Sequence, residues 1–265
     1  LARAVGSSIL VPCISFLFFL YNSIVFMRAA DTARSKIFCF FTFWAIIQVV
    51  TAYFSILRHT VSTQYDMVAA VLVATIAFSA WHIHFGDPGR MPELSAPANI
   101  SKEGLAMYYI GNGLLRAKWC RITDTAIAEY DHFCIWLGAP IGKRNHAAFL
   151  LFLVNLSFGG VLFFWKAHST VNNTSFSSDE SDRTQYLLLC STRALVGALG
   201  CIALLLRQIY LISAGMTTYE YLHRKTLLLH AKQLESKFPS NVWGRGRWQE
   251  IWHSSQMMHS FGREQ

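Results

Sequence analysis

Long apolar runs separated by short polar stretches dominate the chain. Five runs are long enough to cross a bilayer as helices, which takes roughly 17–25 residues each: residues 6–27, 37–57, 67–85, 147–164 and 187–212. They are apolar all round rather than along one stripe, which suits lipid better than the surface of a soluble bundle. The pattern therefore predicts an all-α, polytopic transmembrane helix bundle rather than a soluble bundle with an oversized core.

Composition agrees with this prediction. The chain is 53% hydrophobic and only 14% charged, whereas soluble domains carry charge on about 25% of their residues. Gln48 and Asn155 fall inside spans, where polar side chains usually hydrogen-bond to a neighbouring helix. Arg193 and Arg207 lie toward opposite ends of the fifth span, and we expect them to extend to the lipid headgroups.

Basic residues set the predicted orientation. Lys and Arg concentrate after the first span, between the third and fourth spans, and in the tail, which predicts that these stretches are cytosolic. Asn172 and Asn173 both head glycosylation sequons in the loop between the last two spans, which suits a luminal loop. The net charge of +8 is then a feature of the cytosolic face. Because no basic-aromatic motif accompanies it, nucleic acid is not an expected partner.

The number of spans bears on the start of the chain. Five spans with a cytosolic tail place Leu1 on the luminal side, and a hydrophobic helix follows Leu1 almost directly. We therefore expect a sequence that lacks at least one earlier span.

Cys134 is the candidate nucleophile. Four of the six cysteines, Cys13, Cys39, Cys190 and Cys201, lie in apolar spans, where cysteine usually behaves as a small hydrophobe. Only Cys120 and Cys134 lie in the predicted cytosolic segment, and Cys134 follows Asp131, His132 and Phe133. A nearby imidazole favours the reactive thiolate, and a carboxylate beside the imidazole fixes its tautomer and supports its positive charge.

Further short motifs flank the spans. They are Asp87-Pro88-Gly89 after the third span, Asn145 with Phe149 at the fourth, Thr217-Thr218-Tyr219-Glu220 after the fifth, and Asn241 near Trp243 and Trp248 in the tail. In this order, and together with Asp131-His132-Phe133-Cys134, they resemble the DHHC-type protein S-acyltransferase (palmitoyltransferase) family over nearly the whole chain. The resemblance divides the chain into helices at 1–85, a cytosolic catalytic domain at 86–146, helices with a luminal loop at 147–212, and a cytosolic tail at 213–265. This catalytic domain is expected to be small and irregular.

The resemblance implies a mechanism. Cys134 attacks a long-chain acyl-CoA and passes the acyl group to membrane-proximal cysteines of substrate proteins, with His132 as base and Asp131 as its orienter. Thr218 is expected to reach Asp131, and Asn241 to pack the tail beneath the domain. The basic residues nearest in sequence are candidates to meet the CoA phosphates: Arg116, Lys118, Lys143, Arg144 and Arg224. The implied location is a Golgi or endoplasmic reticulum membrane, and the alternative function is a catalytically inactive membrane adaptor of the same fold.

The chain departs from the family pattern at its zinc sites. A gapless alignment from Asp131 places the eight zinc-ligand positions on Ala106, Tyr109, Trp119, Ala126, Cys120, Thr123, Phe133 and Pro140. A structural zinc needs four Cys- or His-type ligands, so we predict that no zinc is bound and that apolar packing replaces it. Phe133 also replaces the second His of the signature. An aromatic residue there occurs in active members, notably those bearing ankyrin repeats, which have extra spans.

Overall fold

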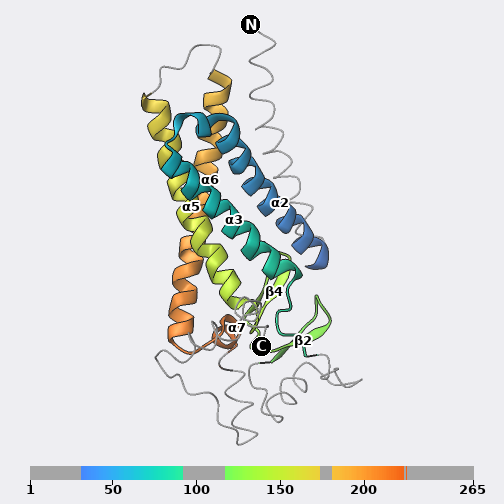
Figure 1. The fold of residues 1–265 in the computed structure, drawn as a ribbon. Helices are drawn as coiled ribbons and strands as arrows, with labels where there is room; N and C mark the ends of the chain where they lie inside the picture. The colour runs from blue at the N-terminus through green and yellow to red at the C-terminus, as the bar shows by residue number, and fades with distance from the viewer. Residues whose placement is uncertain (1–30, 92–116, 174–180, 224, 226–265) are drawn as a thin grey trace, which may run out of the picture.

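The computed structural model describes residues 31–91, 117–173, 181–223 and 225 of the chain (Figure 1). Four helices in this part are long and apolar enough to cross a membrane. They are α2 (Asp31–Ala52), α3 (Thr63–Phe85), α5 (His146–Asn173) and α6 (Ser181–Ser213). They coincide with four of the predicted spans, and the prediction of an all-α polytopic fold is confirmed. The predicted span 6–27 lies outside the described residues.

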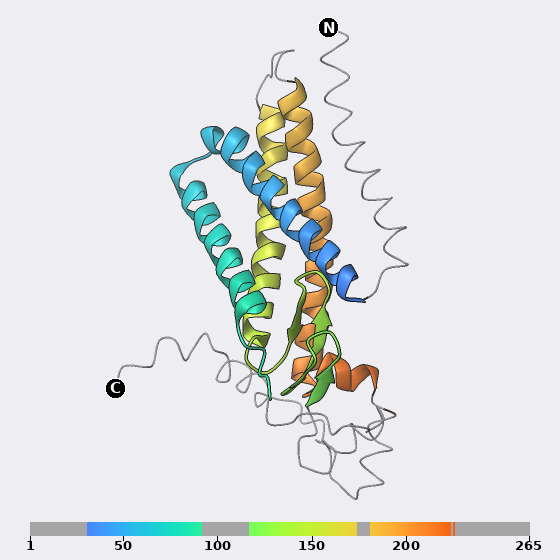
Figure 2. The ribbon, with the colours of Figure 1, turned by 90° about the vertical axis from the view of Figure 1, so that its right-hand side faces the viewer.

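The helices run side by side in a bundle, and α5 lies between α3 and α6 (Figures 1 and 2). Gly160 lets α5 and α6 approach closely, since a Cβ there would lie 2.7 Å from the carbonyl oxygen of Ala194. Asn155 of α5 accepts a hydrogen bond from Thr75 of α3 (2.9 Å), which confirms the helix-to-helix contact predicted for Asn155.

Two short β-hairpins lie beneath one end of the bundle (Figure 2). In the first, β1 (Lys118–Cys120) pairs with β2 (Thr125–Ile127), and in the second, β3 (His132–Cys134) pairs with β4 (Ala139–Ile141). The small domain expected between the third and fourth spans thus contains two hairpins, and turns and loops make up most of the rest of residues 117–145. Strands of three residues are too short to show the alternating pattern by which strands are recognised in a sequence.

The Asp87-Pro88-Gly89 turn joins α3 to these hairpins. Asp87 Oδ1 accepts hydrogen bonds from the backbone N–H groups of Gly89 (3.0 Å) and Arg90 (2.8 Å). Gly89 has a φ of +101°, which L side chains rarely adopt. The Gly89 carbonyl accepts from Ala128 N after β2, and Asp87 Oδ2 accepts from Arg144 just before α5 (2.6 Å). The turn thus fixes the hairpins against the ends of two membrane helices.

Candidate functional site

The carboxylate of Asp131 is the centre of the site. Asp131 is buried just before β3, and four donors meet its two oxygens. Thr218 donates from its backbone N–H to Oδ1 (2.7 Å) and from its hydroxyl to Oδ2 (2.9 Å). His132 Nδ1 (2.8 Å) and Gln208 Nε2 (2.9 Å) also contact Oδ2. Burial by itself raises the pKa of Asp131, but these hydrogen bonds and the charges of His132 and His146 hold it well below the usual range.

His132 connects this carboxylate to Cys134. Residues two apart on a strand point to the same face, so β3 presents the His132 imidazole and the Cys134 thiol together. With Nδ1 on Asp131, the imidazole turns its other nitrogen to Cys134, and the two side chains are hydrogen-bonded. Burial lowers the pKa of His132, but the hydrogen bonds and charges of Asp131 and Cys134 outweigh it and raise the pKa to about 9. His132 is therefore an imidazolium at neutral pH, held between the Asp131 carboxylate and the Cys134 thiol.

The Thr217–Glu220 segment holds Thr218 in place. Helix α6 ends at a left-handed Gly215 (φ +68°), and the N–H of Met216 bonds to the Leu211 carbonyl across that turn. Helix α7 (Thr218–Leu222) then begins with a capping box. The Thr217 hydroxyl accepts from Glu220 N (3.1 Å), and the Glu220 carboxylate accepts from Thr217 N (2.8 Å). These bonds aim the N–H and hydroxyl of Thr218 at Asp131.

Asn145 and Phe149 position the opposite side of the site. Asn145 is buried, accepts from Gly142 N (2.9 Å) and donates to the Pro140 carbonyl (2.9 Å), which anchors β4 to the start of α5. One helical turn later, Phe149 packs against the His132 ring, with the ring centroids 5.1 Å apart. Residues four apart share a helix face, so one turn of α5 both fixes the hairpin and supports the imidazole.

Two residues of the site, Gln208 and His146, were not predicted from the sequence. Gln208 of α6 donates to Asp131 Oδ2 and to the Thr218 hydroxyl (3.1 Å), and its Oε1 lies 3.1 Å from His146 Nε2. The buried Gln208 thus continues the chain of polar contacts from Cys134 through His132 and Asp131 to a second histidine. The sequence does show that Gln208 is a polar residue near the end of an apolar span. It does not show its partners Asp131 and His146, because both lie far from it in the chain.

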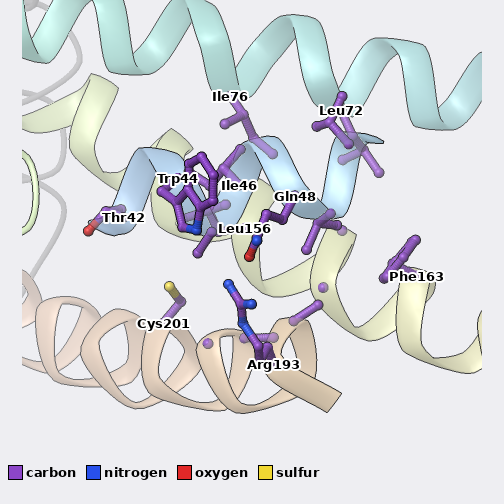
Figure 3. Close-up of a pocket in the computed structure, with 18 of the residues that line it drawn as sticks. Thr42, Trp44, Ile46, Gln48, Leu72, Ile76, Leu156, Phe163, Arg193 and Cys201 are labelled. Atoms are coloured by element: carbon purple, nitrogen blue, oxygen red, sulfur yellow. The ribbon is translucent and has the colours of Figure 1, made fainter. Parts of the chain in front are cut away.

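A large cavity begins at Cys134. It has a volume of about 1580 Å³ and lies between α2, α3, α5 and α6 (Figure 3). Its lining extends from Cys134 and Trp136 to Asp182 and Tyr186 at the other end of α6. Most of the lining side chains are apolar. Arg193 faces this cavity, so the expectation that it extends to the headgroups was wrong: the side of α6 on which it lies faces the bundle.

The comparisons with known proteins agree with this geometry. Residues 112–225 match the family described as DHHC palmitoyltransferase, and this region contains every site residue described above. Palmitoyltransferase akr1 of Neurospora crassa is 32% identical over 123 residues, which cover 41% of this chain and 17% of that protein. Palmitoyltransferase erf2 of Schizosaccharomyces pombe is 32% identical over 119 residues, with 42% and 34% covered. Over this region the chain is similar to the DHHC palmitoyltransferase family. The matched part spans about a third or less of either relative.

The family ordinarily binds zinc, but the residues at the aligned zinc positions of this chain do not fit the metal. Trp119 stands opposite Ala126 across the first hairpin, and Phe133 stands opposite Pro140 across the second. The hairpins therefore bring aligned ligand positions together, but their side chains cannot coordinate zinc. Within the part of the chain that the structure describes, no group of three or more His, Cys, Asp or Glu side chains could hold a metal. Ala106 and Tyr109 lie outside it.

Apolar contacts occupy this part of the DHHC domain. Cys120 is buried with Ile127 and Tyr130, and Phe133 and Tyr219 pack against them half-buried. Trp119, at one of the aligned zinc positions, is half-buried. The cluster joins the first hairpin to the second and to α7.

Three of the candidate CoA-binding residues already have protein partners. The Lys118 ammonium lies over the ring of Tyr219, 3.8 Å from its centroid. Lys143 pairs with Glu129 (3.1 Å), and Arg144 pairs with Asp87 (2.6 Å). Lys143 and Arg144 remain half exposed. Arg116, Arg224 and Asn241 lie outside the described residues, and CoA binding by any of these residues stays a prediction.

Proposed function

We propose that this protein is a protein S-acyltransferase that moves a long-chain acyl group from acyl-CoA to cysteines of membrane-associated proteins through a thioester on Cys134. One observation carries the proposal: the Cys134 thiol, hydrogen-bonded to an Asp131-supported imidazole, lines one end of an apolar cavity between membrane helices. The thiol supplies the nucleophile, and the cavity offers an acyl chain an environment like the lipid it comes from.

In the first half-reaction, the Cys134 thiolate attacks the carbonyl carbon of acyl-CoA. The bond from that carbon to the CoA sulfur breaks as the new thioester forms. The His132 imidazolium then gives its proton to the departing CoA thiolate, and Asp131 stabilises the imidazolium until that transfer.

In the second half-reaction, the roles of His132 reverse. The imidazole has given its proton to the CoA thiolate, and acylated Cys134 carries no charge that would raise the pKa of His132 again. The imidazole can now accept the proton of an incoming protein thiol, which attacks the acyl group and releases Cys134. His132 thus acts as acid in loading and as base in transfer, which extends the base role expected from the sequence.

The test is incubation of the purified protein with labelled long-chain acyl-CoA, followed by detection of hydroxylamine-labile label on the protein. Label on Cys134 that passes to a cysteine peptide bound to lipid vesicles supports the transferase. Saturable binding of acyl-CoA without covalent label would instead support a membrane adaptor and overturn the proposal.

Gln208 is expected to support the reaction as a positioning residue. Gln208→Leu removes one donor from Asp131 Oδ2 and should slow acyl-enzyme formation about tenfold, the effect expected for one hydrogen bond to a buried charge. It should also move the alkaline limb of the pH–rate profile, because the carboxylate that sets the pKa of His132 is less firmly held. Arg207→Leu, at the exposed neighbouring position, is the matched control. An identical pH profile in the two variants would contradict the role of Gln208.

We also propose that the hairpins, α7 and the tail face the cytosol in a Golgi or endoplasmic reticulum membrane, as the basic residues suggest. Asn172 and Asn173 lie exposed at the end of α5, at the opposite end of the bundle from Cys134. When the protein is expressed in eukaryotic cells, a glycosidase-sensitive mobility shift should therefore depend on these two residues and not on Asn99. Glycan at Asn99, which also heads a sequon, would reverse the orientation.

We further propose that the catalytic domain folds and works without zinc. A strong chelator should leave the melting temperature and acyl labelling of the purified protein unchanged, and elemental analysis should find well under one zinc per chain. Loss of folding on chelation is the expected behaviour of a domain held by structural zinc. Phe133→Ala should in contrast lower stability, by about 2–4 kcal/mol for a half-buried ring. Stoichiometric zinc would show that ligands lie elsewhere in the chain.

A further inference from the structure

Two polar side chains interrupt the apolar wall of the cavity. Gln48 of α2 and Arg193 of α6 point toward one another across it (Figure 3). Among the residues that the structure describes, the buried Gln48 Oε1 has no hydrogen-bond partner and Arg193 has no ion pair. A desolvated carbonyl and an unpaired guanidinium are costly unless something bonds to them. This pair therefore has the character of a binding site.

The three tyrosine hydroxyls in the far part of the cavity have protein partners. The Tyr53 hydroxyl donates to Asp66 (2.6 Å), and the Tyr65 hydroxyl donates to the Leu162 carbonyl (3.2 Å). Tyr186 is hydrogen-bonded to Cys190. Gln48 Oε1 and the Arg193 guanidinium face the cavity, and within the described part of the chain no hydrogen bond to that oxygen and no ion pair with that guanidinium is found.

The distance of Gln48 and Arg193 from the Cys134 end of the cavity can be counted along α2 and, separately, along α6. Cys39 of α2 packs beside Gly138 in the turn after Cys134, and Cys201 of α6 packs against the cluster that contains Cys134. Gln48 comes nine residues after Cys39, and Arg193 comes eight residues before Cys201. At about 1.5 Å per residue, both side chains lie roughly 12–14 Å deeper than the thiol. An extended acyl chain of about ten carbons covers that distance.

The two groups together select a hydroxyl. A hydroxyl can donate to Gln48 Oε1 and accept from the Arg193 guanidinium at the same time. A carboxylate would satisfy Arg193 but only accepts, which leaves Gln48 Oε1 unpaired, and a plain methylene chain satisfies neither group. We propose that the preferred acyl donors are long-chain acyl-CoAs that carry a hydroxyl about ten carbons from the thioester. This inference rests on the proposed function, and the hydroxyl itself takes no part in the transfer.

The first test needs only the unmodified protein. Acyl-enzyme formation is measured at limiting concentrations of three donors: octadecanoyl-CoA, the same chain hydroxylated at the tenth carbon, and the chain hydroxylated at the third carbon. The hydroxyl at the tenth carbon should raise the loading rate over the plain chain roughly fivefold to tenfold, as one net hydrogen bond would. The hydroxyl at the third carbon meets the apolar end of the cavity and should lower the rate. Equal or faster loading of the plain chain would overturn the inference.

A second test assigns the preference to residues. Arg193→Leu and Gln48→Leu should each abolish the advantage of the tenth-carbon hydroxyl, while Arg207→Leu, exposed on the same helix and outside the cavity lining, should keep it. A preference that persists in both cavity variants would place the hydroxyl elsewhere and contradict the proposed site. Failure of the proposed function looks different, because then none of the three donors would label the unmodified protein.

Discussion

Replacing Cys134 with serine is expected to abolish hydroxylamine-labile labelling by acyl-CoA, a fall on the order of 10³-fold or more. The thiolate is the attacking species, and a serine hydroxyl is not ionised by an imidazole at neutral pH. The variant should fold, because sulfur and oxygen differ little in size and the main-chain pairing of β3 with β4 is unaffected. Gel-based detection of label before and after hydroxylamine measures the effect.

Cys120→Ser is the matched control for this experiment. Cys120 is also a buried cysteine on a short strand of the same domain, but it packs with Ile127 and Tyr130 on the other hairpin, without a histidine–carboxylate pair. It should keep most of the labelling. If the Cys134 variant labels as strongly as the unmodified protein, the thioester lies elsewhere and the mechanism is wrong.

Asp131→Asn is expected to slow acyl-enzyme formation by roughly 10²–10⁴-fold, the range seen when the carboxylate of a triad is neutralised. The change removes the negative charge that supports the imidazolium. It also places an amide among four hydrogen-bond donors that suit a carboxylate. Single-turnover loading with labelled acyl-CoA separates this effect from any change in the later transfer step.

The pH profile distinguishes this role from a purely structural one. Since the pKa of His132 is raised to about 9, the imidazolium is present at neutral pH and is lost as the pH rises through about 9. Loading by the unmodified protein should therefore decline above that pH, with non-enzymatic thioester hydrolysis measured on the Cys134→Ser variant. In Asp131→Asn the decline should begin at lower pH, because the group that raises the pKa most is gone. An unshifted decline would mean that Asp131 does not govern the imidazole.

The sequence by itself determined the architecture of the bundle. Four predicted spans coincide with membrane-length helices, since a run of apolar residues that matches the bilayer leaves the backbone no alternative to helical hydrogen bonding. It also indicated the reacting group, because Asp131, His132 and Cys134 lie within four residues and their partnership is local. The Thr217–Glu220 capping box is local for the same reason.

Only the tertiary structure decided which distant residues complete the site. Gln208 is separated from Asp131 by 77 positions, and no local pattern marks it as a donor to that carboxylate. From the sequence, Gln48 was expected to hydrogen-bond to a neighbouring helix and Arg193 to extend to the headgroups, whereas both face the cavity. Whether a polar side chain in a span meets lipid, another helix or a cavity depends on the rotation of its helix against its neighbours. That rotation is set by packing between helices, as between Gly160 of α5 and Ala194 of α6. Such packing depends on two distant segments at once, so the sequence of either segment alone does not predict it.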